Sequence, residues 1–321
     1  MFNQVIPDMR YILIMLALII LNTLTYGQGA YLQVKRITSI VDAYPVLSPD
    51  GKSVLFISNR TGVFHMYTMN PDGTNQKQLT TGTVDYVTPV WSPDGKKIAF
   101  ASGRYDESDI CIMNSDGTNE RRLTTTPGDD SHPKFSPDGN KIVYCSAQST
   151  PDLKADWSKQ HIEIYTMNLD GSDIKKITNF KTTTTYPSIS PDGTKIAYRK
   201  IIDAPGFNWD LSTTKRNSEV FVMNIDGTGE RNLSDNTAYD GWPAWTPEGN
   251  VIFSSNRGGV PFKGQLYSVK PDGTVFKQLT DIQHSFVQHS ISVDGKFIFC
   301  QDNTETSEYE FGGIALLPFK P

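Results

Sequence analysis

The stretch Ser92-Pro93-Asp94-Gly95-Lys96-Lys97-Ile98-Ala99-Phe100 decides how the chain folds, because edited copies of it recur along the sequence. Its Ser-Pro-Asp-Gly turn has three near-copies and two looser ones, at residues 48–51, 136–139, 190–193, 246–249 and 292–295. Six copies of one unit indicate a repeat architecture, and a repeat must be identified before other motifs are interpreted.

A second landmark, an Asp-Gly turn after an apolar stretch, fixes the layout of each unit. Its glycine stands at position 73, 117, 171, 227 or 273, and the next unit's turn glycine always follows 22 residues later. The other half of the unit varies in length. It runs 21 residues from Gly51 to Asp72, but 31 from Gly139 to Asp170 and 33 from Gly193 to Asp226. Insertions are therefore expected in one place only, between the second and third strands of a unit.

Each unit predicts four short strands. Proline and glycine at the second and fourth positions suit a type I turn after the first strand. An apolar run such as 141–145 forms the second strand, a third leads into Asp-Gly, and a polar stretch such as 120–124 forms an exposed outer strand. Five first strands contain a proline three residues before the turn, which indicates an edge strand because proline cannot donate to the ladder. The sequence thus predicts an all-β, six-bladed β-propeller of four-stranded blades.

The two ends of the chain predict how the ring closes. The sixth unit supplies a second strand at 296–301 and a third at 313–317, but no fourth. Residues 32–38 have the fourth-strand pattern without a unit of their own. We therefore expect this N-terminal strand to complete the last blade of a propeller domain at 31–321, which we expect to be a monomer.

Motifs within residues 89–124 are specific enough to compare with a known family. They read Pro-x-Trp-Ser-Pro-Asp-Gly-Lys-Lys-Ile-Ala-Phe, Asp-Ile-x-x-Met-Asn-x-Asp-Gly-Thr and Arg-Arg-Leu-Thr. This unit resembles the repeat of the TolB-like six-bladed β-propeller family, and the resemblance covers residues 31–317. We expect no counterpart of the α/β domain that precedes the propeller in TolB itself. The family includes binding modules, propeller domains of serine peptidases and stand-alone enzymes, so the resemblance implies a fold without selecting a function.

The N-terminal segment predicts export. Arg10 precedes an apolar run at 11–21, and small or polar residues follow through Gly27. A membrane span needs about 20 apolar residues, so segment 1–27 is interpreted as a signal peptide, with a retained N-terminal anchor as the alternative. The protein is therefore expected to be periplasmic or secreted, without a membrane span once the signal is cleaved.

Composition excludes several classes of function. A net charge of −5 and a pI near 5.6 give no basic surface, so nucleic acid is not an expected partner. The three cysteines form no CxxC pair and lie within apolar stretches, which indicates buried thiols. Neither a Gly-x-Ser-x-Gly elbow, a His-Glu-x-x-His motif nor a phosphate-binding glycine loop is present.

The entrances of the inner strands carry a candidate metal site. Three residues before the proline position, the first, third and fifth units have Asp42, Asp130 and Asp240. Three carboxylates around the channel mouth would suit Ca²⁺ or another divalent cation, since hard ions prefer oxygen ligands. The alternative is that each aspartate bonds nearby backbone amides, as in an Asx-turn. No cofactor is certain from the sequence.

Two histidines beside the inner-strand prolines are the catalytic candidates. His132 precedes Pro133, and His289 replaces the sixth proline. Together with Asp130, they would serve as a general base or as metal ligands. The alternative is that they are hydrogen-bonded residues of the channel wall.

Insertions in the third and fourth units, at 149–161 and 200–217, form the second candidate site. They come from adjacent blades and are expected to lie side by side on the loop-rich face. Aromatic rings beside carboxylates suit sugar or peptide binding, although the tryptophans would also serve simply to pin long loops. With two inner-strand residues included, the predicted binding set is Asp156, Trp157, His161, Trp209, Asp210, Tyr186 and Trp242.

Two functions follow as hypotheses. The first is a binding module that engages a protein or glycan through the loop-rich face. The second is a stand-alone enzyme, a carbohydrate- or lactone-directed lyase or hydrolase with its site at the channel mouth. The sequence does not decide whether the protein is catalytic.

Overall fold

The computed structural model describes residues 35–38, 41–105, 107–156, 159–207, 213–257, 263–280, 284–303 and 312–319. The chain separates into two units, residues 1–31 and Leu32–Pro321. The predicted signal peptide lies outside the described residues, as do Trp157, Trp209 and Asp210. Throughout the described ranges the regular structure is β-strand.

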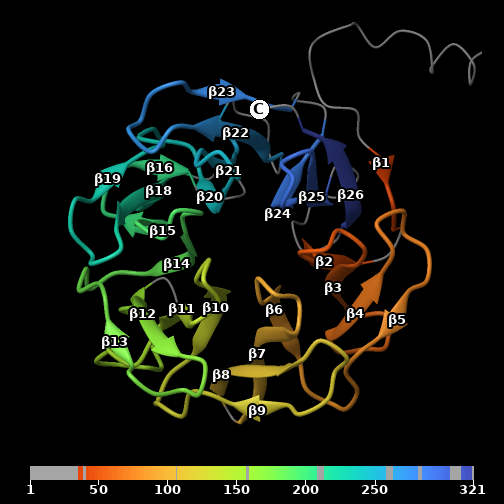
Figure 1. Cartoon of the computed structure of the whole chain (residues 1–321). Coiled ribbons are helices and arrows are strands. Elements are labelled where there is room, and N and C mark those ends of the chain that lie inside the picture. Colours follow the sequence, from red (N-terminus) through yellow and green to blue (C-terminus); the bar gives the residue numbers. More distant parts are fainter. Residues whose placement is uncertain are drawn as a thin grey trace, which may run out of the picture. The chain divides into compact units, whose positions relative to one another are not determined.

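Six four-stranded antiparallel sheets form the blades, arranged in a ring with their first strands innermost (Figure 1). Blade 1 consists of β2 (Asp42–Leu47), β3 (Val54–Ser58), β4 (His65–Met69) and β5 (Lys77–Gln78). Blade 2 consists of β6 (Tyr86–Trp91), β7 (Lys97–Tyr105), β8 (Glu107–Asn114) and β9 (Arg121–Arg122). Blade 3 consists of β10 (Asp130–Phe135), β11 (Lys141–Ser146), β12 (Glu163–Asn168) and β13 (Lys175–Lys176). Blade 4 consists of β14 (Thr184–Ile189), β15 (Lys195–Ile202), β18 (Asn217–Asn224) and β19 (Arg231–Asn232). Blade 5 consists of β20 (Asp240–Trp245), β21 (Val251–Ser255), β22 (Gln265–Val269) and β23 (Lys277–Gln278). Blade 6 consists of β24 (Phe286–Ile291), β25 (Phe297–Asp302), β26 (Gly313–Pro318) and the N-terminal strand β1 (Lys35–Arg36).

The repeated turn is held by its own side chains. Ser92 Oγ donates to Asp94 Oδ1 at 2.6 Å and accepts from the Lys97 amide at 2.9 Å, while Asp94 Oδ1 also accepts from the Lys96 amide. Gly95 has a φ of 69°, a left-handed conformation that glycine adopts without steric cost. This network explains why the motif needs serine, aspartate and glycine at these positions, and it lowers the pKa of Asp94 chiefly through the Ser92 hydroxyl.

The hydrophobic core lies between blades. Six buried clusters occur among the described residues, and each joins two adjacent blades. In the cluster between blades 1 and 2, for example, Leu55 and Met66 pack with Phe100 and Cys111. The second strands are apolar on both faces because a neighbouring blade covers each face, as predicted. All three cysteines are buried and free.

The ring closes through the N-terminal strand, as predicted. β1 pairs with β26 in blade 6, with Lys35 opposite Leu316 and Arg36 opposite Ala315. The Ile37 amide donates to the Ile314 carbonyl at 2.8 Å, and the Thr38 hydroxyl accepts from the Ile314 amide at 2.8 Å. Residues from the two ends of the propeller therefore share one sheet.

Candidate functional site

A backbone irregularity is repeated in the innermost strand of every blade. In β10, two residues, His132 and Pro133, stand opposite the single residue Tyr144 of β11, which defines a β-bulge. The first bulge residue has a left-handed backbone, with φ between 49° and 56° in the set Tyr44, Thr88, His132, Tyr186, Trp242 and Gln288. Non-glycine residues rarely adopt this conformation, and such strain clusters at functional sites.

These bulges line a cavity of about 220 Å³ in the centre of the ring. All six left-handed residues contribute to its wall, together with the residues that follow five of them. The polar and aromatic members of the wall are Tyr44, Thr88, His132, Lys134, Tyr186, Ser188, Trp242, Gln288, His289 and Ser290. A concave site with aromatic walls and a few polar groups is the usual form of a small-ligand pocket.

Aromatic rings are concentrated on the side formed by blades 3 to 5. The rings of His132 and Tyr186 are 4.0 Å apart, and those of Tyr186 and Trp242 are 5.9 Å apart. Behind them, the buried guanidinium of Arg199 lies 5.3 Å from the ring centre of Tyr186 and donates to the hydroxyl of Tyr239. This wall therefore combines rings with a fixed positive charge, a cation–π arrangement.

Burial keeps the channel histidines neutral. It lowers the pKa of His132 to about 3, assisted by the charges of Arg199 and Lys134. It also lowers the pKa of His289 to about 4, although a hydrogen bond with the Ile252 carbonyl opposes the shift. Both imidazoles are therefore uncharged at neutral pH and can offer one donor and one acceptor each.

Asp42, Asp130 and Asp240 do not line this cavity. All three are fully buried inside their own blades. Asp42 accepts from Arg60 Nη2 at 3.0 and 3.3 Å, and Asp240 accepts from Arg257 Nη2 at 3.2 and 3.3 Å. Among the described residues, no three His, Cys, Asp or Glu side chains lie close enough to hold a metal ion. The shared cation site thus stays a prediction. The contacts of Asp42 and Asp240 are local, but their partners are side chains and not the backbone amides of an Asx-turn.

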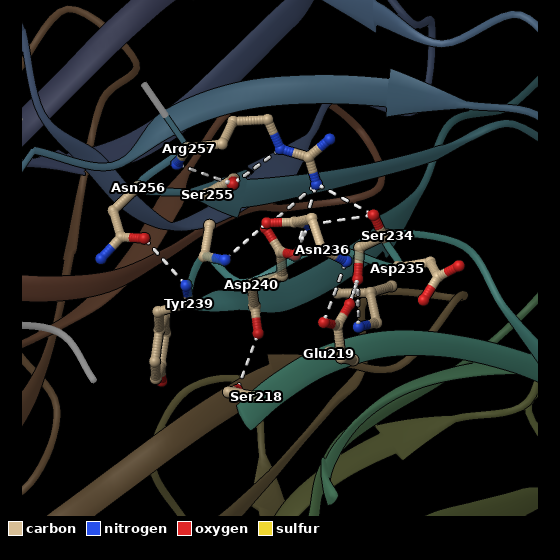
Figure 2. Close-up of polar contacts among 12 residues, drawn as sticks. Ser218, Glu219, Ser234, Asp235, Asn236, Tyr239, Asp240, Ser255, Asn256 and Arg257 are labelled. Carbon is tan, nitrogen blue, oxygen red and sulfur yellow. Dashed lines mark hydrogen bonds and ion pairs between the residues drawn. The ribbon is translucent and has the colours of Figure 1, made fainter. Parts of the chain in front are cut away.

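Figure 2 shows the network around Asp240 at the boundary of blades 4 and 5. The Asn236 amide donates to Asp240 Oδ2 at 2.6 Å, and the Asn236 backbone donates to Glu219 Oε1 at 3.2 Å. Glu219 also accepts from the hydroxyl of Ser234. Burial raises the pKa of Glu219 to about 7. Two buried acids therefore share a bridging asparagine, and Asp240 also contacts Arg257, which identifies the network as a structural one within the blades.

Asp130 differs from the other two aspartates. Gln148 occupies the position at which blades 1 and 5 carry Arg60 and Arg257. The contact of its carboxylate with the Thr126 hydroxyl is 3.4 Å long, and burial raises the pKa of Asp130 to about 6.

The two insertions meet at the connection between blades 3 and 4. The Gln160 carbonyl, from the first insertion, accepts from the Thr183 hydroxyl at 3.0 Å. Arg216, from the second, donates to the Thr182 hydroxyl at 3.0 Å. The second insertion also forms a small hairpin, β16 (Gly206–Phe207) with β17 (Thr213–Thr214). Of the predicted binding residues in these loops, Asp156 is exposed and His161 is partly buried.

Sequence reasoning missed Arg199, Lys134 and Tyr239. A signal was present for Arg199, which interrupts an apolar second strand. The corresponding positions in the other blades hold Ile57, Ala101, Cys145, Ser254 and Gln301. Lys134 and Tyr239 gave no such signal, because lysine after a proline and tyrosine in a loop are ordinary on a surface. Their role emerges only when the bulges turn neighbouring side chains into one cavity.

No family model matches the chain. A stretch of 120 residues is 30% identical to a Protein TolB homolog of Chlorobaculum tepidum and covers 37% of this chain and 24% of that protein. The chain thus spans about a quarter of the length of that curated relative.

Solved structures share the fold over a larger part of the chain. The putative TolB from Agrobacterium tumefaciens matches 90% of this chain and 98% of its own, with a TM-score of 0.64 and 20% identity. An oligogalacturonate lyase in complex with manganese matches 92% and 96%, with a TM-score of 0.58 and 16% identity. At these identities the likeness establishes the fold only. Across the described ranges, no helix is long and apolar enough to cross a membrane.

Proposed function

Because the chain is a six-bladed propeller of the TolB-like type, we propose that it is a binding module for a glycan or protein ligand. The ligand would occupy the central cavity and extend over the loops of blades 3 and 4. The observation that carries this proposal is the cavity wall, in which six strained backbone positions present mainly aromatic and polar side chains to one space. A folding requirement alone would favour glycine or asparagine at such positions.

The same blades supply both parts of the proposed site. Blades 3 to 5 provide the rings of His132, Tyr186 and Trp242, and blades 3 and 4 provide the two insertions. Rings contribute large contact areas to sugars or peptides while their polar edges fix orientation. The predicted signal peptide would carry this site to the periplasm or outside the cell, where such ligands occur.

A ligand screen tests the proposal. The protein would be exposed to panels of soluble oligosaccharides and peptides, and binding would be read as a rise in melting temperature and confirmed by calorimetry. Trp242→Ala should abolish binding, since its indole forms part of the wall. Phe276→Ala is the matched control, because this ring lies in the same blade, is 42% exposed and is not part of the wall. Equal binding by both variants would contradict a site in the cavity.

A carbohydrate- or lactone-directed lyase or hydrolase is the second candidate. It is favoured by the neutral imidazoles of His132 and His289 in the cavity, since an unprotonated ring nitrogen can bind a metal ion or accept a proton. A structural neighbour named as an oligogalacturonate lyase was solved with manganese, so Mn²⁺ and oligogalacturonate are the first probes. Turnover that requires Mn²⁺ and disappears in His289→Ala would support this function. Ligand binding without turnover in the presence of Mn²⁺, Ca²⁺ or Mg²⁺ would contradict the enzyme and favour the binding module.

A further inference from the structure

Lys134 places an ammonium group in the wall of the central cavity. Its charge lowers the pKa of both His132 and His289, which locates it near both rings. None of the residues that line the cavity is an aspartate or glutamate. Within the described part of the chain, no carboxylate lies within ion-pair distance of Lys134, whereas the exposed Lys141 pairs with Asp173 at 3.0 Å. A second cation, Arg199, stands behind the Tyr186 ring.

Lys134 is partly buried, and a positive charge withdrawn from water is costly unless something compensates it. Burial lowers the pKa of Lys134 only to about 8, so the amine is still mostly protonated at neutral pH. An anionic ligand in the cavity would supply this compensation, and its charge would be held by Lys134 with Arg199 contributing at longer range.

The cavity wall also contains buried polar atoms without a hydrogen-bond partner among the described residues. The imidazole of His289 is buried, and its Nε2 is 3.1 Å from the Ile252 carbonyl, so Nε2 carries the proton and Nδ1 is left with a lone pair. That buried Nδ1 and the buried hydroxyl of Thr88 have no hydrogen-bond partner among the described residues. A hydroxyl of a ligand would supply the missing donor to this lone pair, because a buried acceptor without a hydrogen bond is destabilising.

From these groups we propose that the cavity binds a monosaccharide-sized, polyhydroxylated carboxylic acid, with its carboxylate at Lys134 and a hydroxyl donating to His289 Nδ1. This inference rests on the proposed function, because it names the chemistry of the ligand part that enters the channel. The aromatic wall at Tyr186 and Trp242 would contact the face of the sugar ring. The volume of about 220 Å³ is large enough for one such unit.

Matched acidic and neutral sugars test the proposal. Calorimetry at pH 7 would compare D-glucuronate, D-galacturonate and D-mannuronate with D-glucose, D-galactose and D-mannose, using the full propeller. At least one hexuronate is expected to bind, and its parent hexose is expected to bind at least tenfold more weakly. Lys134→Met should remove this preference, whereas Lys96→Met, which deletes an 81% exposed lysine, should retain it. His289→Phe should weaken both the acid and the hexose, because it deletes the hydroxyl acceptor.

The outcomes separate the two proposals. If neutral oligosaccharides or peptides bind and Trp242→Ala abolishes this binding, while no hexuronate binds, the channel module stands and the acid inference is overturned. Equal affinity of the unmodified protein and Lys134→Met for a hexuronate would also overturn it. If peptides with a free terminal carboxylate bind better than any hexuronate, the anionic group is right but the sugar class is wrong. Lys134→Met should melt no lower than the unmodified protein, which shows that lost affinity is not lost folding.

Discussion

Three aspartates that look equivalent in the sequence have different surroundings in the fold. Asp42 and Asp240 each contact an arginine two residues past the end of the neighbouring strand, through Arg60 and Arg257. Each arginine is also held by a serine hydroxyl and lies over aromatic rings. In blade 3 the position of that arginine is taken by Gln148, so Asp130 has a different environment. Position in a repeat therefore predicts where the aspartate lies in its blade. Whether its carboxylate has an arginine partner depends on a second residue elsewhere in that blade.

Removal of Asp240 should be costly. Asp240→Ala leaves the Arg257 guanidinium, only 22% exposed, without its carboxylate, so we expect the free energy of unfolding to fall by roughly 2–4 kcal/mol. Urea denaturation would measure the loss, and the double variant Asp240→Ala/Arg257→Met should recover part of it. A loss below about 0.5 kcal/mol, within the range of surface pairs, would contradict a buried structural role.

Replacement of Asp130 should give a different, pH-dependent result. Its pKa of about 6 in the folded state exceeds the ordinary value of about 4, so the protonated form is favoured by folding. The protonated Asp130 carboxyl therefore stabilises the fold below pH 4. As pH rises through 6 this contribution is lost, and the free energy of unfolding falls by roughly 2–3 kcal/mol. Asp130→Asn should therefore become more stable relative to the unmodified protein between pH 4 and 8, as measured by urea denaturation. Asp203→Asn, at a 90% exposed side chain, is the control, and a difference that does not change with pH would refute the assignment.

The repeated bulge is the element that lines the central cavity. The sequence shows the proline of five of the six bulges. It does not indicate the left-handed backbone of the residue before each proline, because histidine, tryptophan and threonine seldom adopt that conformation. Proline in the inner strand therefore predicted an edge correctly. The channel candidates His132 and His289 do lie in the cavity wall, but the bulges that shape this wall were not predicted. The insertions were visible as length differences, but their tryptophans lie outside the described residues. Repeats are predictable from local spacing, whereas the cavity depends on six distant strands meeting.

Thr88 offers a test of backbone strain in this element. A β-branched residue with φ of 50° is strained, and asparagine tolerates this conformation better. Thr88→Asn is expected to raise the free energy of unfolding by about 0.5–1 kcal/mol, and denaturant titration would detect the change. The same exchange at Thr74, an exposed turn residue, would serve as the comparison. A stabilisation equal at both positions would show that strain is not the cause.

The first insertion should affect long ligands more than short ones. Its described part is tied down by Gln160, which donates to the carbonyls of Leu153 and Ala155, and the blade below it is complete without it. Replacing 149–161 with a short connection copied from 104–108 should leave the melting temperature within a few degrees. Under the proposed function, this variant should bind a single hexuronate normally but lose the extra affinity of an oligouronide. Unchanged oligomer affinity in calorimetry would remove the insertion from the site.

At the scale of the whole molecule, the ring is stabilised by contacts between blades, so each blade depends on two neighbours. The six core clusters each join one pair of adjacent blades, including the cluster of Val54 and Phe56 with Phe299 and Ile314 at the seam. Blade 6 is built from both ends of the propeller and is the point at which the ring would open. The strand β1 covers the edge of β26 there, and an uncovered edge invites pairing with other chains.

Deletion through residue 38 should therefore weaken the entire propeller and not only blade 6. It removes the pairing of Lys35 and Arg36, the Ile37 hydrogen bond and the Thr38 hydroxyl that accepts from the Ile314 amide. We expect the melting temperature to fall by several degrees and the truncated protein to associate at high concentration, as seen by calorimetry and light scattering. A truncation that ends at residue 30 keeps the strand and is the control. Thr38→Val, which deletes one buried acceptor, should reproduce a loss of about 1 kcal/mol. If the longer truncation melted like the shorter one, closure by the N-terminal strand would contribute nothing to the stability of the ring.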